Sequence, residues 1–220
     1  MRRQFEEAEA ELKNQIVAMG SLAEEMIHSA IQGLSERSRE PLGKVTRNEE
    51  QVNRLHIAVD SRSVNLIALH QPTATDLRFI IAATKINSDL ERIGDQAVNI
   101  SETTALLLDM PQLERKLLDI PRMAELAQGM LKDSLDAFVR RDVALARTVI
   151  ARDEEEDKLK SQAFNELMHL MQSDASTIQR ALGLILIARN LERIADHATN
   201  IAEDVIFMTL GKDIRHHAVQ

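Results

Sequence analysis

The chain contains no cysteine, which excludes disulfides and thiolate chemistry and favours a reducing compartment. Tryptophan and tyrosine are also missing, so five phenylalanines are the only large aromatic rings on which nucleic-acid bases could stack. There is no block of lysine and arginine, and the net charge of −8 disfavours binding to a phosphate backbone. Nucleic acid is therefore not an expected partner.

Long apolar runs and a leader-like N-terminus are missing as well. The longest uninterrupted apolar stretch lies near residues 181–188, well short of the roughly 20 residues that a membrane-spanning helix needs. Residues 1–7 read MRRQFEE, which is charged where a signal peptide would be apolar. We therefore expect a cytoplasmic protein.

Seven glycines and four prolines in 220 residues leave few places for a helix to break. Apolar residues recur at helical spacing from Met19 to Leu34, and no useful segment alternates with a period of two. We expect interruptions at 40–43, at 70–72 and in a linker between Pro111 and Pro121. Side-chain oxygens within 73–76 are expected to cap a third helix that runs to about residue 108.

The pattern then starts again. Residues 19–26 (MGSLAEEM) align with 123–130 (MAELAQGM) at an offset of about 104 positions. Residues 90–102 align with 191–203 at an offset of about 101 positions. The sequence therefore predicts an all-α protein of six long antiparallel helices, organised as two tandem three-helix bundles over residues 1–112 and 113–220.

Acidic and amide side chains form a stripe on the third helix of each unit. At about 100° per residue these side chains fall within about 80° of one another, while Ile86, Leu90, Ile93, Ala97 and Ile100 face the core. The stripe residues are Glu91, Asp95, Asn99 and Glu102 in the first unit, and Glu192, Asp196, Asn200 and Glu203 in the second. The stripe is therefore expected on the outer face of each bundle.

The second helix of each unit carries a matching set of polar residues. Helices packed side by side lie roughly 8–10 Å apart, so the polar side chains of the second and third helices could meet in one shallow groove. Clustered oxygen donors without thiolates suit magnesium, manganese, iron, calcium or, less well, zinc. The second-helix residues are Glu49, Asn53, His56 and Asp60, and, at the offset of about 104, Asp153 and Asp157.

A charged face exposed to solvent is the simpler interpretation of any single acidic stripe. Two features favour a cation site instead. Like charges four residues apart destabilise a helix by roughly 0.2–0.5 kcal/mol per pair, and both Glu91/Asp95 and Glu192/Asp196 are such pairs. The stripe also occurs in both units, although much of the sequence between them differs. Arg92 and Arg193 could relieve part of the repulsion.

Two other classes of protein are considered. A di-metal carboxylate enzyme needs paired Glu-x-x-His motifs in a bundle core, but Glu25/His28 and Glu166/His169 are expected to point to solvent. No phosphate-binding glycine loop, nucleophile elbow or H-E-x-x-H motif is present, so a regulator is favoured over an enzyme. His197 is expected to pack against neighbouring side chains, or to hold a metal-binding side chain in place, rather than to bind metal itself.

A metal-free helical scaffold is the remaining alternative. Residues 106–108 (LLL) and 207–210 (FMTL) are apolar at the ends of corresponding helices. They either close the two bundles together or form the seam of a homodimer, and the sequence leaves both arrangements open.

At these residues the sequence resembles the PhoU family of phosphate-uptake regulators. The resemblance covers essentially the whole chain, and the paired E-R-I-x-D blocks are its most specific part. The segments that carry it are 71–80 (QPTATDLRFI), 89–102 (DLERIGDQAVNISE) and 188–203 (ARNLERIADHATNIAE).

The resemblance implies acidic surface motifs that bind multinuclear metal clusters, typically of iron or zinc, with manganese or magnesium as further candidates. These motifs fall on Glu91 and Asp95 and on Glu192 and Asp196, extended by the Asn and Glu residues of each stripe. The family's second-helix positions fall on Glu49, Asn53, Asp60, Asp153 and Asp157. Asn53 stands where an acid is common, Phe164 stands opposite Asp60 in the repeat, and Gly94 becomes Ala195, so the two sites are not expected to be equal.

The same resemblance implies the biological role. It is that of a homodimeric cytoplasmic adaptor, peripheral to the membrane, between a phosphate ABC transporter and a sensor histidine kinase. Such a protein represses phosphate-starvation genes when phosphate is plentiful and modulates phosphate uptake.

Overall fold

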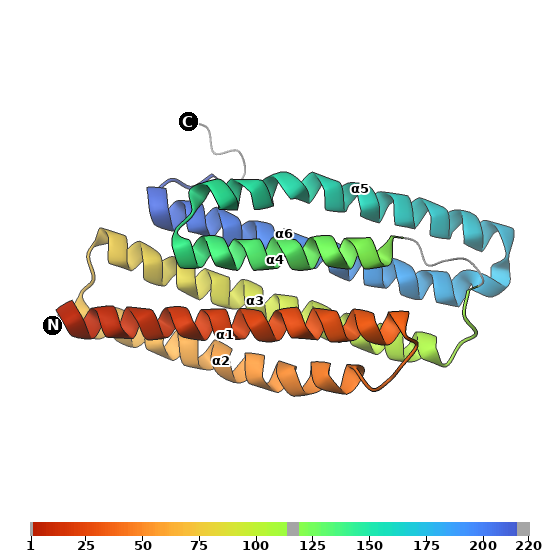
Figure 1. The fold of residues 1–220 in the computed structure, drawn as a ribbon, viewed down its shortest axis with the longest axis horizontal. Helices are drawn as coiled ribbons and strands as arrows, with labels where there is room; N and C mark the ends of the chain where they lie inside the picture. Colours follow the sequence, from red (N-terminus) through yellow and green to blue (C-terminus); the bar gives the residue numbers. More distant parts are fainter. Residues whose placement is uncertain (1, 114–118, 215–220) are drawn as a thin grey trace.

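The structure is a computed structural model that describes residues 2–113 and 119–214 of the chain. Within these residues it contains six α-helices, a short 3-10 helix and no β-strand (Figure 1). The helices are α1 (Arg2–Ser35), α2 (Leu42–His70), α3 (Ala74–Leu108), α4 (Ile120–Arg140), α5 (Val143–Ser173), η1 (Ala175–Thr177) and α6 (Ile178–Leu210). The all-α architecture predicted from the sequence is confirmed.

The predicted helix ends are confirmed, but one predicted cap is wrong. α2 ends where Gln71 adopts a left-handed conformation (φ 46°), immediately before Pro72. Thr73 occupies the N-cap position of α3, but its hydroxyl donates a hydrogen bond to Asp76 Oδ2 at 2.9 Å. Contrary to the expectation, the Thr73 hydroxyl accepts no hydrogen bond from the backbone N–H groups of the first turn. The 3-10 turn η1 was not foreseen.

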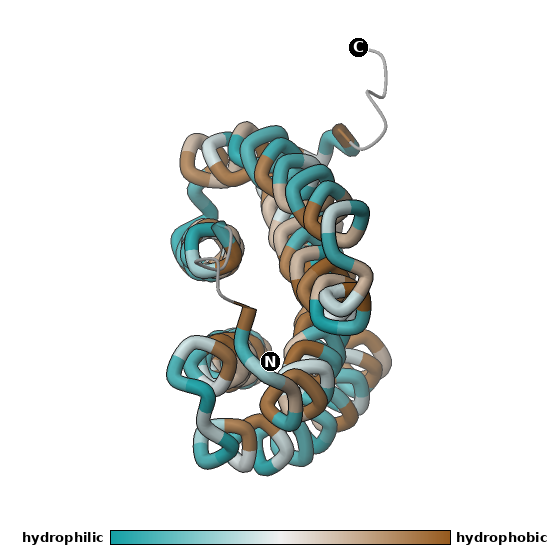
Figure 2. The backbone as a smooth tube through the Cα atoms, turned by 90° about the vertical axis from the view of Figure 1, so that its right-hand side faces the viewer, coloured by the Kyte–Doolittle hydropathy of each residue, from teal (hydrophilic) through white to brown (hydrophobic). Residues whose placement is uncertain are grey.

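The two triplets of helices share one continuous core. α1, α2 and α3 pack on one another, as do α4, α5 and α6, and α3 packs along α6 more extensively than any other pair. α1 also contacts α4, whereas α2 and α5 lie at opposite edges of the molecule (Figure 1). Apolar residues turn toward the interior of this arrangement (Figure 2). The terms first half (α1–α3) and second half (α4–α6) are used below; a domain boundary at residues 112/113 stays a prediction.

Two glycines allow the halves to approach closely. A Cβ atom on Gly20 of α1 would lie 2.3 Å from Leu135 Cδ1 of α4, and one on Gly183 of α6 would lie 2.8 Å from Leu107 Cδ2 of α3. Leu107 is buried in this contact, while its neighbour Leu106 is 66% exposed. The apolar end of α3 therefore closes the two halves together through Leu107.

The predicted inner face of α3 is confirmed. Ile86, Leu90, Ile93, Ala97 and Ile100 are all fully buried, and Asp95, Asn99 and Glu102 are exposed. None of the described helices is long and apolar enough to cross a membrane.

The assignment of faces predicts different effects for two substitutions two residues apart. Ile93→Ala should lower the free energy of unfolding by about 2–4 kcal/mol, because it opens a cavity in the core. Asp95→Ala should change it by less than about 0.5 kcal/mol, because the side chain is on the surface. Urea denaturation followed by circular dichroism measures both; an equal loss in the two variants would contradict the assignment.

Candidate cation site

The first-half stripe lies beside α2, where the two helices touch. Gly94 of α3 faces Val52 of α2, and a Cβ atom on Gly94 would lie 3.5 Å from Val52 Cγ1. This contact places Glu49 and Asn53, which flank Val52, next to the part of α3 that carries Glu91 and Asp95. Glu49 and Glu91 are half-buried, and Asn53 and Asp95 are exposed.

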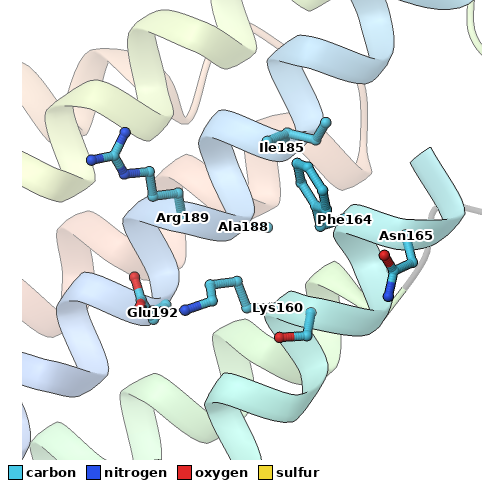
Figure 3. A pocket seen from close by; sticks show the side chains of 8 residues that line it. Lys160, Phe164, Asn165, Ile185, Ala188, Arg189 and Glu192 are labelled. Atoms are coloured by element: carbon cyan, nitrogen blue, oxygen red, sulfur yellow. Dashed lines mark hydrogen bonds and ion pairs between the residues drawn. The ribbon is translucent and has the colours of Figure 1, made fainter. Parts of the chain in front are cut away.

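The second-half stripe meets α5 through hydrogen bonds and ion pairs. Thr199 of α6 donates a hydrogen bond to Asp153 Oδ1 at 3.2 Å. Further along the same seam, the ammonium group of Lys160 on α5 lies 2.6 Å from Glu192 Oε1 and 2.8 Å from Asp157 Oδ1. Figure 3 shows Lys160 extending from α5 toward Glu192 on α6. The structure therefore brings Asp153, Asp157 and Glu192 to one seam.

Crowding of carboxylates along this seam changes their acidity. The pKa of Asp196 is raised to about 6 because its carboxyl is partly desolvated where the helices meet, and because Glu192, Asp153 and Asp157 add negative charge. Desolvation also raises the pKa of Asp153, although its bond to Thr199 opposes this. The two hydrogen bonds to Asp157 and Glu192 raise the pKa of Lys160, so its charge is held firmly.

Glu156 is the functional candidate that the sequence interpretation missed. It is 1% exposed, and neither of its carboxyl oxygens has a hydrogen-bond partner among the described residues. Burial, followed by the charges of Glu192, Glu155, Asp157 and Asp153, raises its pKa to about 8. Its spacing from the buried Val149 and Leu159 is that of a core position, and this signal was available in the sequence.

Two predicted ligands lie elsewhere. Asp60 and Asn200, assigned to opposite halves, both line a polar pocket of about 510 Å³ between α2, α3 and α6. Asp60 accepts a hydrogen bond from Asn87 at 3.0 Å, and Asn200 approaches Asp89 of α3 at 3.4 Å. They therefore belong to the junction between the halves and not to the seams with Glu91 or Glu192.

His197 belongs to the same junction. Its Nδ1 lies 2.8 Å from Asp89 Oδ1, and the residue is buried. Beside it, Lys85 Nζ lies 3.1 Å from Asp204 Oδ1. This buried position beside Asp89 is consistent with the expectation that His197 packs against other side chains or holds one in place.

The Glu-x-x-His pairs lie on the surface, as predicted. Glu25, His28, Glu166 and His169 are all exposed, and Glu25 accepts a hydrogen bond from Asn48 at 2.9 Å. Their exposure gives no support to a di-metal site in the core.

Among residues 2–113 and 119–214, no group of three or more Asp, Glu or His side chains lies close enough together to hold a metal ion. In the second half, the Lys160 ammonium already lies between Asp157 and Glu192.

Comparison with known proteins decides the family. The model of the PhoU domain matches residues 16–104 and 120–205. The chain belongs to the PhoU family. The two PhoU matches fall on the first and second halves, in agreement with the internal repeat.

Relatives in the PhoU family are similar along nearly their whole length. A phosphate-specific transport system accessory protein PhoU homolog of Aquifex aeolicus (strain VF5) is 38% identical over 216 residues, covering 98% of this chain and 97% of the relative. The homolog of the same name from Caulobacter vibrioides (strain NA1000 / CB15N) is 37% identical, covering 96% of this chain and 92% of the relative.

Solved PhoU structures have the same fold. The crystal structure of PhoU from Pseudomonas aeruginosa superimposes with a TM-score of 0.92 at 34% identity, over 94% of this chain and all of that one. The phosphate transport system regulatory protein PhoU from Streptococcus pneumoniae gives a TM-score of 0.88 at 28% identity, over 95% of this chain and 98% of that one.

The buried acid of this PhoU-family chain predicts a pH-dependent stability. Between the unfolded pKa of 4.5 and the folded pKa of about 8, the folded chain holds a proton on Glu156 that the unfolded chain releases. The free energy of unfolding therefore falls as the pH rises through this window, by at most about 1.4 kcal/mol per pH unit. Glu156→Gln should flatten this dependence, as measured by urea denaturation in chelator between about pH 5 and pH 8.

The matched control is Glu155→Gln. Glu155 is exposed and forms an ion pair with Arg122 at 2.9 Å; its charge adds to the raised pKa of Glu156, but burial is the larger cause, so Glu155→Gln should keep most of the pH dependence. If wild type and Glu156→Gln show the same pH dependence, Glu156 does not titrate as described.

Proposed function

We propose that this chain is a negative regulator of phosphate-starvation genes and a modulator of phosphate uptake. It would act in the cytoplasm as a metal-binding adaptor between a phosphate ABC transporter and a sensor histidine kinase. The supporting observation is similarity over almost the full length to proteins named as accessory to the phosphate-specific transport system. The similarity therefore covers every helix of this chain and is not confined to one module.

A bound cation is proposed at two seams, where side chains of neighbouring helices would reorient to share it, because no three Asp, Glu or His side chains already lie together among the described residues. In the first half the donors would be Glu49, Asn53, Glu91 and Asp95, brought near one another by the contact of α2 with α3. In the second half they would be Asp153, Asp157, Glu192 and Asp196; burial, and then repulsion from the other three, raises the pKa of Asp196. A bound divalent ion would supply the positive charge that these carboxylates lack and would tie each outer helix to its neighbour.

Metal content tests the cation site. Untagged protein grown in metal-replete medium should contain iron, zinc or manganese above one equivalent by elemental analysis. Asp95→Ala and Asp196→Ala together should remove the metal and leave the helical circular dichroism intact, because neither side chain is in the core. Metal-free wild-type protein would argue against this part of the proposal.

A reporter experiment tests the regulatory role. Deletion should make phosphate-starvation genes constitutive at high phosphate, and the wild-type chain should restore repression. A reporter that stays repressed in the deletion strain would contradict the role.

A metal-free scaffold is the second candidate, because Lys160 already bridges Asp157 and Glu192 without an ion. The Asp95→Ala/Asp196→Ala variant separates the two candidates in the reporter strain. The adaptor proposal expects loss of repression together with loss of metal, and the scaffold proposal expects repression to persist.

A homodimer is part of the proposal, and the exposed apolar residues beside the α3–α6 contact are its candidate surface. Leu107 packs against Gly183. Leu106 precedes Leu107 on α3, and Leu182 precedes Gly183 on α6, with Leu186 one turn later. Leu106, Leu182 and Leu186 are between 47% and 66% exposed. Light scattering of wild type and of Leu106→Ser/Leu186→Ser measures the oligomeric state; an unchanged dimer in the variant would place the interface elsewhere.

A further inference from the structure

The second half contains a carboxylic acid where the first half contains an apolar side chain. In the repeat, Glu156 of α5 corresponds to Val52 of α2, and Ala195 of α6 corresponds to Gly94 of α3. Val52 packs on Gly94 and completes the core at that point. Helix packing at this level therefore has an apolar solution in the same chain, and the fold does not need an acid there.

The position of Glu156 is unfavourable for stability. Both carboxyl oxygens are buried without a hydrogen-bond partner among the residues that the structure describes. A buried polar group without a partner lowers the stability of the fold relative to one that is hydrogen-bonded. Packing does not account for this residue, but a ligand that uses its two oxygens does.

The surroundings of Glu156 indicate the charge of that ligand. Asp157 follows Glu156 directly, Asp153 lies on the same helix less than one turn before it, and Glu192 of α6 reaches the same seam. One ammonium group, that of Lys160, lies among them and contacts Asp157 and Glu192, but makes no hydrogen bond to Glu156. A single positive charge is thus shared among several carboxylates, and the seam has room for more positive charge than it holds.

Lys160 is suited to leave this position. Its charge sits at the end of a flexible four-carbon chain, and its side chain is 33% exposed. It also lines an open pocket of about 600 Å³ between α5 and α6, together with Ser161, Phe164 and Arg189 (Figure 3). The ammonium can therefore move toward water without any change in the helices.

We propose that Glu156 is the inner ligand of the second-half divalent-cation site, a ligand that the first-half site lacks, and that the Lys160 ammonium takes the place of the ion in the cation-free protein. The inference rests on the metal binding proposed above. It assigns to the site a ligand and a competing cation that have no counterpart in the first half, where Val52 and His56 occupy the equivalent positions. Because the donors are all carboxylate oxygens, the site should take a hard ion such as Mn²⁺ or Mg²⁺.

The experiment measures Mn²⁺ binding to the full-length chain. Free Mn²⁺ is followed by electron paramagnetic resonance at one fixed pH, after chelation and removal of the chelator. All variants carry Asp95→Ala, which disables the first-half site. Glu156→Gln is expected to weaken binding at least about tenfold, and Lys160→Met is expected to strengthen it by about the same factor, because the ion no longer displaces an ammonium.

Two controls separate a lost ligand from a lost fold or a changed net charge. Glu155→Gln removes the same charge from the neighbouring residue, which pairs with Arg122, and should change the affinity less than about twofold. Glu156→Gln should remain folded by circular dichroism and should unfold at no lower urea concentration than its background, because it removes a buried acid.

A second measurement follows Lys160 directly. Acetylation of the Lys160 amine, read by mass spectrometry, should become several times faster when Mn²⁺ is saturating, because displacement frees it from Asp157 and Glu192. Lys158, which pairs with Glu154 on the exposed side of α5, serves as the internal reference.

The outcomes distinguish this inference from the proposed function. If the background binds Mn²⁺ and Glu156→Gln binds it as well as Glu155→Gln does, the inference is overturned and the proposed metal binding stands. If neither the Asp95→Ala background nor its Lys160→Met variant binds Mn²⁺, the inference is overturned, whereas the proposed metal binding falls only if elemental analysis also finds no iron, zinc or manganese.

Discussion

The antiparallel packing of α3 against α6 is the contact on which the rest of the arrangement depends. Gly183 lets the two helices approach at Leu107, and Asp89 bonds His197 across the same interface. Each of these helices also packs against the two other helices of its own half. Joining them therefore fixes both halves and leaves α2 and α5 at opposite edges, where α2 has a polar seam with α3 and α5 has one with α6. The candidate cation sites lie on those seams because the centre is already filled.

The duplicated seams have the same geometry and different chemistry. Along α2 the inward and flanking residues are Val52, Asn53 and His56, whereas along α5 the corresponding residues are Glu156, Asp157 and Lys160. The second seam therefore concentrates negative charge and offsets part of it with an ammonium. Since the affinity of a site for hard cations rises with the number of charged ligands, we expect the second seam to bind such cations more tightly than the first.

The fold could be predicted from the sequence because its signals are local. Proline at 41, 72 and 111 and the helical spacing of apolar residues located the helix ends, and the repeat located the corresponding helices. The face of each stripe was also predictable, since side chains four residues apart on one helix share a face. The missing cap at Thr73 could not be predicted, because the Thr73 hydroxyl can bond either to the backbone or to the side chain of Asp76. Only the structure shows that it bonds to Asp76.

The composition of the site was harder to predict, because it depends on how two helices are placed against each other. A stripe of Glu192, Asp196 and Asn200 turns slowly around α6, so that one end faces α5 and the other faces α3. This drift follows from 3.6 residues per turn, but the partner at each end depends on tertiary packing. Glu156 was missed for another reason. Cation ligands were expected only on the outward faces of the helices, although the repeat aligns Glu156 with a valine.

An exchange of Lys160 for a divalent ion would change more than the occupancy of one site. The ion would bring two positive charges while the ammonium stays tethered nearby, and Glu156 would release the proton that its raised pKa retains near neutral pH, so the surface around the α5–α6 seam would become more positive by about one unit. At physiological ionic strength a charge is felt over about 8 Å, which includes the pocket with Phe164 and Arg189 next to Lys160. A partner that contacts this surface would therefore sense the ion through charge and the freed lysine, without any rearrangement of the helices that α3 and α6 hold in place.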